Sequence, residues 1–253
     1  GELQAADDPR IAVAARSLEA LRVKAASALE RPTLSALRRH VGQASASGVD
    51  VALLVDVSQS MEGALEDLQR EALWLFPALS WALPGLRMGL VLYRDGVETA
   101  LDFSLVPSGD VLRLIRESKA EGGGDVPEGV HEAVKAALSL GRLRWREPAE
   151  KHIVILGDAP PPHVEVEGLL GLVRQSYRQG GYRVHSLGIR PEEGRTAVPS
   201  FPEIAKAGGG RAVSITDPSR IGSEVFLALF PREAHEAVEA VLPAVKAIFR
   251  VDG

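Results

Sequence analysis

Short apolar runs alternate with helical segments along most of this chain, and that alternation limits the fold more than any other feature of the sequence. Val49–Val55, Met88–Tyr93 and His152–Leu156 are apolar almost throughout, and Tyr182–Ile189 is predicted to be a further buried strand. Runs of this kind are typical of strands that are buried on both faces of a parallel sheet. Segments with apolar residues three and four positions apart separate them, so the sequence predicts a doubly wound α/β sheet.

Turn chemistry and weaker patterns predict the remaining elements. Arg94-Asp95-Gly96 is a tight-turn signal before the alternating run Val97–Phe103, which indicates a hairpin with one antiparallel edge strand. A weak strand is expected at Arg211–Ile215. Apolar spacing predicts the helices, which we expect at Leu65–Leu83, near 108–119, at Val130–Leu138, and near 164–179, 201–207 and 218–230.

Helical segments flank this α/β region on both sides. Residues 8–30 and Thr33–Val41 are predicted to be helices, and the small polar run 42–48 (GQASASG) is predicted to be a linker. Residues 232–249 carry an apolar stripe and are expected to pack on the domain. The predicted organisation is therefore an N-terminal helical extension at 1–47, an α/β domain at 48–231 and a C-terminal helix at 232–253.

Composition excludes several classes of function. The chain has 253 residues, and 29 Lys and Arg against 34 Asp and Glu give a net charge of −5, which disfavours nucleic-acid binding. It contains no cysteine, which rules out disulfides and thiolate metal sites. No apolar run is long enough to span a membrane. The chain begins with Gly1, so we expect a processed form in which a signal peptide cannot be judged.

Oxygen-bearing side chains follow the first predicted strand. Asp56, Ser58 and Ser60 alternate, so an extended backbone would place all three on one side. One carboxylate and two hydroxyls suit a hard cation. The structural alternative is that Ser60 caps the next helix and Asp56 simply ends the strand.

Two later loops carry further carboxylates. Gly122–Glu128 (GGGDVPE) precedes a predicted helix, and Asp125 with Glu128 could instead form a capping box. Asp158 ends the run HIVILGD and precedes three prolines, where it could be an ordinary turn residue. His163, just beyond, is expected to be a surface residue.

Together these loops predict a metal centre. In an open parallel sheet, ligands bind beyond the carboxyl ends of the strands, so Asp56, Glu128 and Asp158 should meet at one edge. Three carboxylates in one place repel each other unless a cation lies between them. Mg²⁺, with Mn²⁺ or Ca²⁺ as alternatives, is the ion that such oxygen ligands favour.

The pattern Asp56-x-Ser58-x-Ser60, with Asp158 after a later strand, resembles the metal-ion-dependent adhesion site (MIDAS) of von Willebrand factor A-type domains. The resemblance covers about residues 49–230 and implies six strands with helices on both faces. That family usually supplies a Thr from the middle loop. The run GGGDVPE resembles instead the variant of integrin β-type and alpha-kinase-associated A domains, which places Glu128 at the Thr position.

The resemblance implies a binding module instead of an enzyme. Its metal ion, held by Asp56, Ser58, Ser60, Glu128 and Asp158, would be completed by an acidic side chain of a partner protein. Because A domains of this type often act outside the cell, an exported bacterial protein is expected. Two alternatives stay open at this point: a magnesium-dependent phosphohydrolase or phosphotransferase on a similar sheet, and a scaffold domain that has lost the metal.

Overall fold

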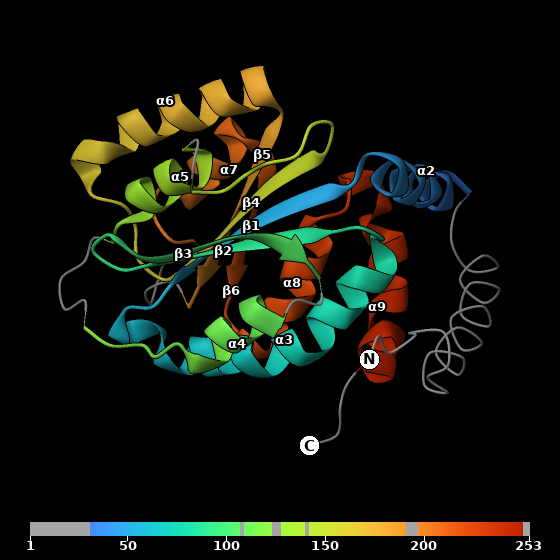
Figure 1. Ribbon diagram of the computed structural model, residues 1–253, viewed down its shortest axis with the longest axis horizontal. Helices are drawn as coiled ribbons and strands as arrows, with labels where there is room; N and C mark the ends of the chain where they lie inside the picture. Colours follow the sequence, from blue (N-terminus) through green and yellow to red (C-terminus); the bar gives the residue numbers. More distant parts are fainter. Residues whose placement is uncertain (1–30, 107–108, 123–127, 140–141, 191–196, 250–253) are drawn as a thin grey trace.

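The computed structural model describes residues 31–106, 109–122, 128–139, 142–190 and 197–249, with the side chains described from residue 39 onward. The predicted helix at 8–30 lies outside these residues. Within them the predicted α/β fold is confirmed (Figure 1). The division of the chain into an extension, a domain and a C-terminal helix stays a prediction.

A single six-stranded sheet runs through the molecule in the order β3-β2-β1-β4-β5-β6. Its strands are β1 (Val49–Asp56), β2 (Arg87–Tyr93), β3 (Val97–Leu105), β4 (Glu150–Gly157), β5 (Tyr182–Ile189) and β6 (Gly209–Ile215). Only the β2–β3 pair is antiparallel, which confirms the predicted hairpin at one edge. β1 and β4 are parallel neighbours in the centre of the sheet. The loops that follow them therefore leave from the same end of the strands, the carboxyl end.

Helices cover both faces of this sheet, as the alternating sequence predicts (Figure 1). One face packs against α5 (Val130–Leu138), α6 (His163–Gly180) and α7 (Phe201–Ala207). The other packs against α3 (Glu62–Ala82), α4 (Gly109–Glu117), α8 (Ile221–Ala228) and α9 (His235–Phe249). Short 3₁₀ turns occur at η1 (Gln59–Met61), η2 (Pro218–Arg220) and η3 (Arg232–Ala234). Among the described residues, no helix has the length and apolar character needed to cross a membrane.

The predicted linker at 42–48 is wrong, because helix α2 extends over Arg31–Ser47. Ala44 is fully buried and packs in the core. The small, polar composition of residues 42–48 does not indicate this contact. The hydroxyls of Ser45 and Ser47 donate to carbonyls four residues earlier and so satisfy themselves within the helix. Gly48, at φ +80°, ends the helix and leads directly into β1.

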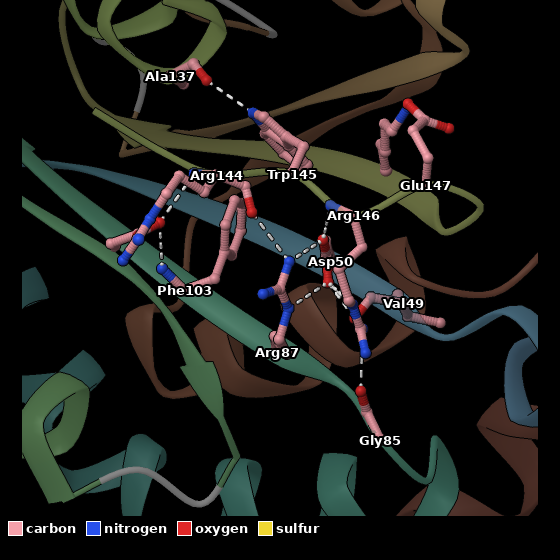
Figure 2. A network of polar contacts seen from close by, with 12 residues as sticks. Val49, Asp50, Gly85, Arg87, Phe103, Ala137, Arg144, Trp145, Arg146 and Glu147 are labelled. Atoms are coloured by element: carbon pink, nitrogen blue, oxygen red, sulfur yellow. Dashed lines mark hydrogen bonds and ion pairs between the residues drawn. The ribbon is translucent and has the colours of Figure 1, made fainter. Parts of the chain in front are cut away.

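A buried ionic network fixes the start of β1 (Figure 2). The Asp50 carboxylate accepts from Arg87 on β2, with Nε to Oδ1 at 3.0 Å and Nη2 to Oδ2 at 2.6 Å. Arg146 donates to the same carboxylate through its backbone N–H at 2.8 Å and its Nε at 2.9 Å. These contacts join β1, β2 and the segment before β4, and so set the position of the strand whose far end carries Asp56.

Candidate functional site

The first loop holds Asp56, Ser58 and Ser60 close together, but its backbone conformation differs from the extended one that we predicted. Asp56 Oδ1 accepts from the Ser58 backbone N–H at 2.8 Å, and the hydroxyls of Ser58 and Ser60 lie 3.1 Å apart. The backbone is not extended throughout, because Gln59–Met61 forms a 3₁₀ turn. Ser60 does not cap α3, whose N-cap is Met61, so the structural alternative for this serine is wrong.

Glu128 lies at the same edge of the sheet and is not part of a capping box. Helix α5 begins at Val130 with Gly129 as its N-cap, which places Glu128 before the helix instead of at its third position. The Glu128 backbone N–H donates to Pro160 O at 3.0 Å, which joins the middle loop to the loop after β4. The Glu128 side chain is only 3% exposed. Asp125 lies outside the described residues.

Asp158 completes the group from the end of β4. Its carboxyl is half-buried and lies near enough to Asp56 for its charge to raise the pKa of that group. The third loop therefore lies beside the first, at the carboxyl ends of the neighbouring strands β1 and β4. His163, at the start of α6, is exposed as expected.

Burial and mutual repulsion disfavour the charged forms of all three carboxyls. Burial raises the pKa of Asp56 to about 6, and the Asp158 charge raises it further against the opposing hydrogen bond from Ser58. Burial, followed by the charges of Asp56, Asp95 and Asp158, raises the pKa of Glu128 to about 7. Burial also raises the pKa of Asp158. The three side chains are thus close enough for their charges to act on one another.

Several carboxylate oxygens in this group have no hydrogen-bond donor. Asp56 Oδ2, Glu128 Oε2 and Asp158 Oδ1 are all buried and unpartnered. A buried carboxylate oxygen without a donor is costly, and a cation satisfies it. The oxygens therefore fit a hard divalent ion. Over the part of the chain that the structure describes, no group of three or more Asp, Glu or His side chains is arranged so that it could hold a metal ion, so this fit rests on the chemistry of the donor oxygens.

Two further residues, Tyr93 and Asp95, lie beside this group. Tyr93 is fully buried and donates from its hydroxyl to Leu156 O at 3.1 Å. A Cβ on Gly157 would lie 2.6 Å from that hydroxyl and 3.2 Å from Asp56 Oδ2, so only glycine leaves room for both groups. Asp95, which we interpreted as a hairpin residue alone, is close enough to raise the pKa of Glu128. No signal in the sequence links either residue to the metal loops.

Backbone hydrogen bonds fix the first loop against its neighbours. Val57 N donates to Tyr93 O at 2.8 Å, and Gln59 N donates to Gly122 O at 2.9 Å. Arg94 donates to Glu121 O and forms an ion pair with Glu98 at 2.9 Å. Main-chain hydrogen bonds therefore hold the first loop against β2 and the middle loop, in addition to the bond from Ser58 N–H to Asp56 Oδ1.

Comparisons with known proteins agree with the fold. Residues 51–160 match the sequence profile of the von Willebrand factor type A domain. The conserved hypothetical protein BatB from Bacteroides thetaiotaomicron has a similar structure, with a TM-score of 0.54 and 18% identity over 76% of this chain and 100% of its own. The chain has a von Willebrand factor A-type fold.

Two further solved structures share the A-type fold. The SpRpn10 VWA domain superposes with a TM-score of 0.55 at 15% identity, over 74% of this chain and 97% of its own. Proximal thread matrix protein 1 from the mussel byssus, described with a zinc-occupied MIDAS motif, superposes at 0.50 with 16% identity, over 70% of this chain and 44% of its own. No curated protein matches the chain in sequence. At these identities the likeness extends to the A-type fold and not to the GGGDVPE variant of the metal site.

Proposed function

We propose that this chain is a metal-dependent interaction module, in which a divalent cation at the edge of the sheet binds an acidic side chain of a partner protein. Domains of the A type generally serve in protein interactions, which supports the first part of the proposal. The observation that carries the metal is the set of three buried, donor-free carboxylate oxygens on Asp56, Glu128 and Asp158.

The donor set favours a hard cation. Asp56, Ser58, Ser60, Glu128 and Asp158 offer only oxygen, which Mg²⁺, Mn²⁺ and Ca²⁺ prefer. Zn²⁺ belongs among the ions to be tested, because the related structure of proximal thread matrix protein 1 is described with zinc at its MIDAS motif. When bound, the cation would supply an electrophilic centre for an incoming carboxylate.

Glu128 sets this site apart from the usual pattern with Thr in the middle loop. A carboxylate adds a negative charge beside Asp56 and Asp158, so the cation is held more tightly. The same charge lowers the electrostatic attraction for a partner's carboxylate. We therefore propose the Glu-containing variant of the site, with strong metal retention and moderate affinity for the partner.

Calorimetric titration with Mg²⁺, Mn²⁺, Ca²⁺ and Zn²⁺ tests the metal centre. We expect saturable binding of at least one ion, and loss of that binding in Asp56→Asn. Asp110→Asn, an exposed carboxyl in the first turn of α4, is the matched control and should bind like the wild type. Glu128→Thr should bind the ion about tenfold more weakly, because the site loses one charge.

Two outcomes would contradict the proposal. Absence of binding heat with all four ions at millimolar concentration would leave a metal-free scaffold. Equal affinity in the wild type and in Asp56→Asn would place the ion elsewhere on the molecule.

We also propose that the chain is not an enzyme. Ser58 occupies the position two residues after Asp56, where the phosphotransferases considered above carry a second acid. The metal-loaded protein should therefore not hydrolyse p-nitrophenyl phosphate above the rate of the buffer. Turnover that disappears in Asp56→Asn would overturn this part of the proposal.

A further inference from the structure

A second candidate site lies at the opposite end of the sheet from the metal loops. A cavity of about 670 Å³ opens where β5 and β6 begin, next to the end of α6 and the segment Ala228–His235. Its volume is in the range of small-molecule sites. This cavity lies at the amino ends of the strands, whereas the metal loops follow their carboxyl ends. None of the proposed metal ligands therefore lines the cavity.

Arginine side chains from three different elements line this cavity. Arg183 comes from β5, Arg211 from β6 and Arg232 from η3, whereas Glu233 is the one acidic residue of the lining. With the histidines neutral, these groups carry a net charge of +2. Arg232 is exposed and forms no ion pair with any residue that the structure describes.

The carboxylates behind the cavity each lie near more than one basic side chain. Glu224 lies 2.9 Å from Arg211 and 2.7 Å from Arg220. Glu150 lies 3.8 Å from Arg183 and equally far from His40. Arg211 Nη1 is buried and lies 2.9 Å from Glu224 Oε2, so Glu224 already balances part of the charge of this guanidinium group. Glu224 and Glu150 therefore offset part of the charge of Arg211 and Arg183, whereas Arg232 keeps its full charge toward the cavity.

A β-bulge directs Arg211. Val184 pairs with Gly209 and Ser186 pairs with Ala212, so two residues of β6 lie opposite His185 alone. The displaced Arg211 N–H donates to His185 Nδ1 at 3.2 Å instead of to a strand carbonyl. A Cβ at position 210 would lie 2.0 Å from Val184 O, so only glycine permits this bulge. Bulges at sheet edges commonly re-aim a side chain toward a site.

We propose that this cavity binds a small molecule that carries a phosphate group. Guanidinium groups match phosphate oxygens in a planar, two-bond geometry, and a dianion balances the charge of the lining. The Tyr177 ring, which lies against Gly209 and is 42% exposed, offers an apolar wall for the rest of the ligand. The probes that test this are inorganic phosphate, phenyl phosphate and benzoate.

Titration of the full chain in EDTA, followed by calorimetry or NMR, separates this site from the proposed metal centre. We expect saturable binding of phosphate, and tighter binding of phenyl phosphate, which also contacts Tyr177. Arg232→Gln should weaken phenyl phosphate binding about tenfold, the effect of one lost charged hydrogen bond. Because Arg232 is exposed, this variant should fold normally, which its thermal unfolding will show.

Arg70→Gln on α3 is the matched control, since its side chain is 65% exposed and lies outside the cavity. It should bind phenyl phosphate like the wild type. Equal affinities of the wild type and Arg232→Gln would overturn the proposal, as would binding of benzoate as tight as that of phenyl phosphate. These results do not depend on divalent ions, so the metal proposal can fail or succeed on its own.

Discussion

Two aspartates on one strand show how strongly the surroundings decide the state of a carboxyl group. Asp50, at the start of β1, accepts from Arg87 and Arg146, and these bonds hold its pKa below the ordinary range although burial opposes them. Asp56, at the end of the same strand, has no cation beside it, and burial raises its pKa to about 6. The first carboxylate is satisfied by the protein, whereas Oδ2 of the second has no hydrogen-bond donor among the described residues.

Replacing Asp50 should therefore be costly. Asp50→Asn leaves two guanidinium groups facing a neutral side chain in a buried place, and we expect the free energy of unfolding to fall by about 3 kcal/mol. Urea denaturation measures this change.

Asp110→Asn provides the comparison, because its ion pair with Arg113 is exposed on both sides and should contribute less than about 1 kcal/mol. Similar losses in the two variants would mean that the network around Asp50 contributes no more than a surface pair.

The residues of the metal loops can be predicted from the sequence, whereas Tyr93 and Asp95 beside them cannot. Asp56, Ser58, Ser60 and Asp158 follow apolar runs, so their place at the ends of strands could be predicted. Tyr93 and Asp95 approach the same place through the pairing of β2 with β1. That proximity depends on strand order, which spacing along the chain does not encode.

At the scale of elements, a row of histidines joins β6, β5, β4 and α2. Because the Arg211 N–H can only donate, His185 Nδ1 accepts, and His185 Nε2 donates to His152 Nδ1 at 3.1 Å. Both rings are therefore neutral. His152 Nε2 faces Glu150 at 3.7 Å, and Glu150 in turn lies 3.8 Å from His40 on α2.

This row predicts a pH dependence of stability. Burial lowers the pKa of His185 well below its ordinary value, and the charges of His152, Arg183, Arg211 and His235 lower it further. Burial also lowers the pKa of His152, although Glu150 opposes this. In the unfolded chain both histidines take up protons near pH 6.5. The stability they contribute is therefore present above about pH 6.5 and is lost as the pH falls below it.

The measurement compares the free energy of unfolding of the wild type and His185→Gln between pH 7.5 and 5. The wild type should lose up to about 1.4 kcal/mol more per pH unit below pH 6.5, the effect of one proton. His163→Gln, at an exposed position, should keep the slope of the wild type. Parallel curves for the wild type and His185→Gln would contradict the prediction.

Element boundaries show where local patterns failed. The composition of 42–48 is typical of a loop, yet α2 continues to Ser47 because Ala44 packs in the core. Glu128 has the spacing of a capping residue, yet α5 starts two residues later. In both places a tertiary contact outweighs the local preference.

At the scale of the whole molecule, the two ends of the sheet differ in charge. Acidic side chains gather where β1 and β4 end, and arginines gather where β5 and β6 begin. Parallel strands make this separation possible, because all their carboxyl ends lie at one edge. We therefore expect the two proposed sites to attract ligands of opposite charge, one at the carboxyl ends of the strands and the other at their amino ends.

Metal binding should stabilise the whole domain. An ion that binds only the folded chain raises the free energy of unfolding by about 2.7 kcal/mol at 100 times its dissociation constant. Thermal unfolding with and without Mg²⁺ should show this as a higher midpoint in the wild type and no change in Asp56→Asn. A shift of the same size in both would indicate general salt stabilisation.

The sequence by itself determined the layers of the fold and the strand-end positions of the metal loops. Apolar periodicity and the chemistry of residues at strand ends are local properties, and local properties can be read along the chain. The tertiary structure alone decided which carboxyl is paired and which is not, where α2 ends, and that three arginines share a cavity. Those outcomes depend on burial and on contacts between residues far apart in the chain, such as the contact of Asp50 with Arg146.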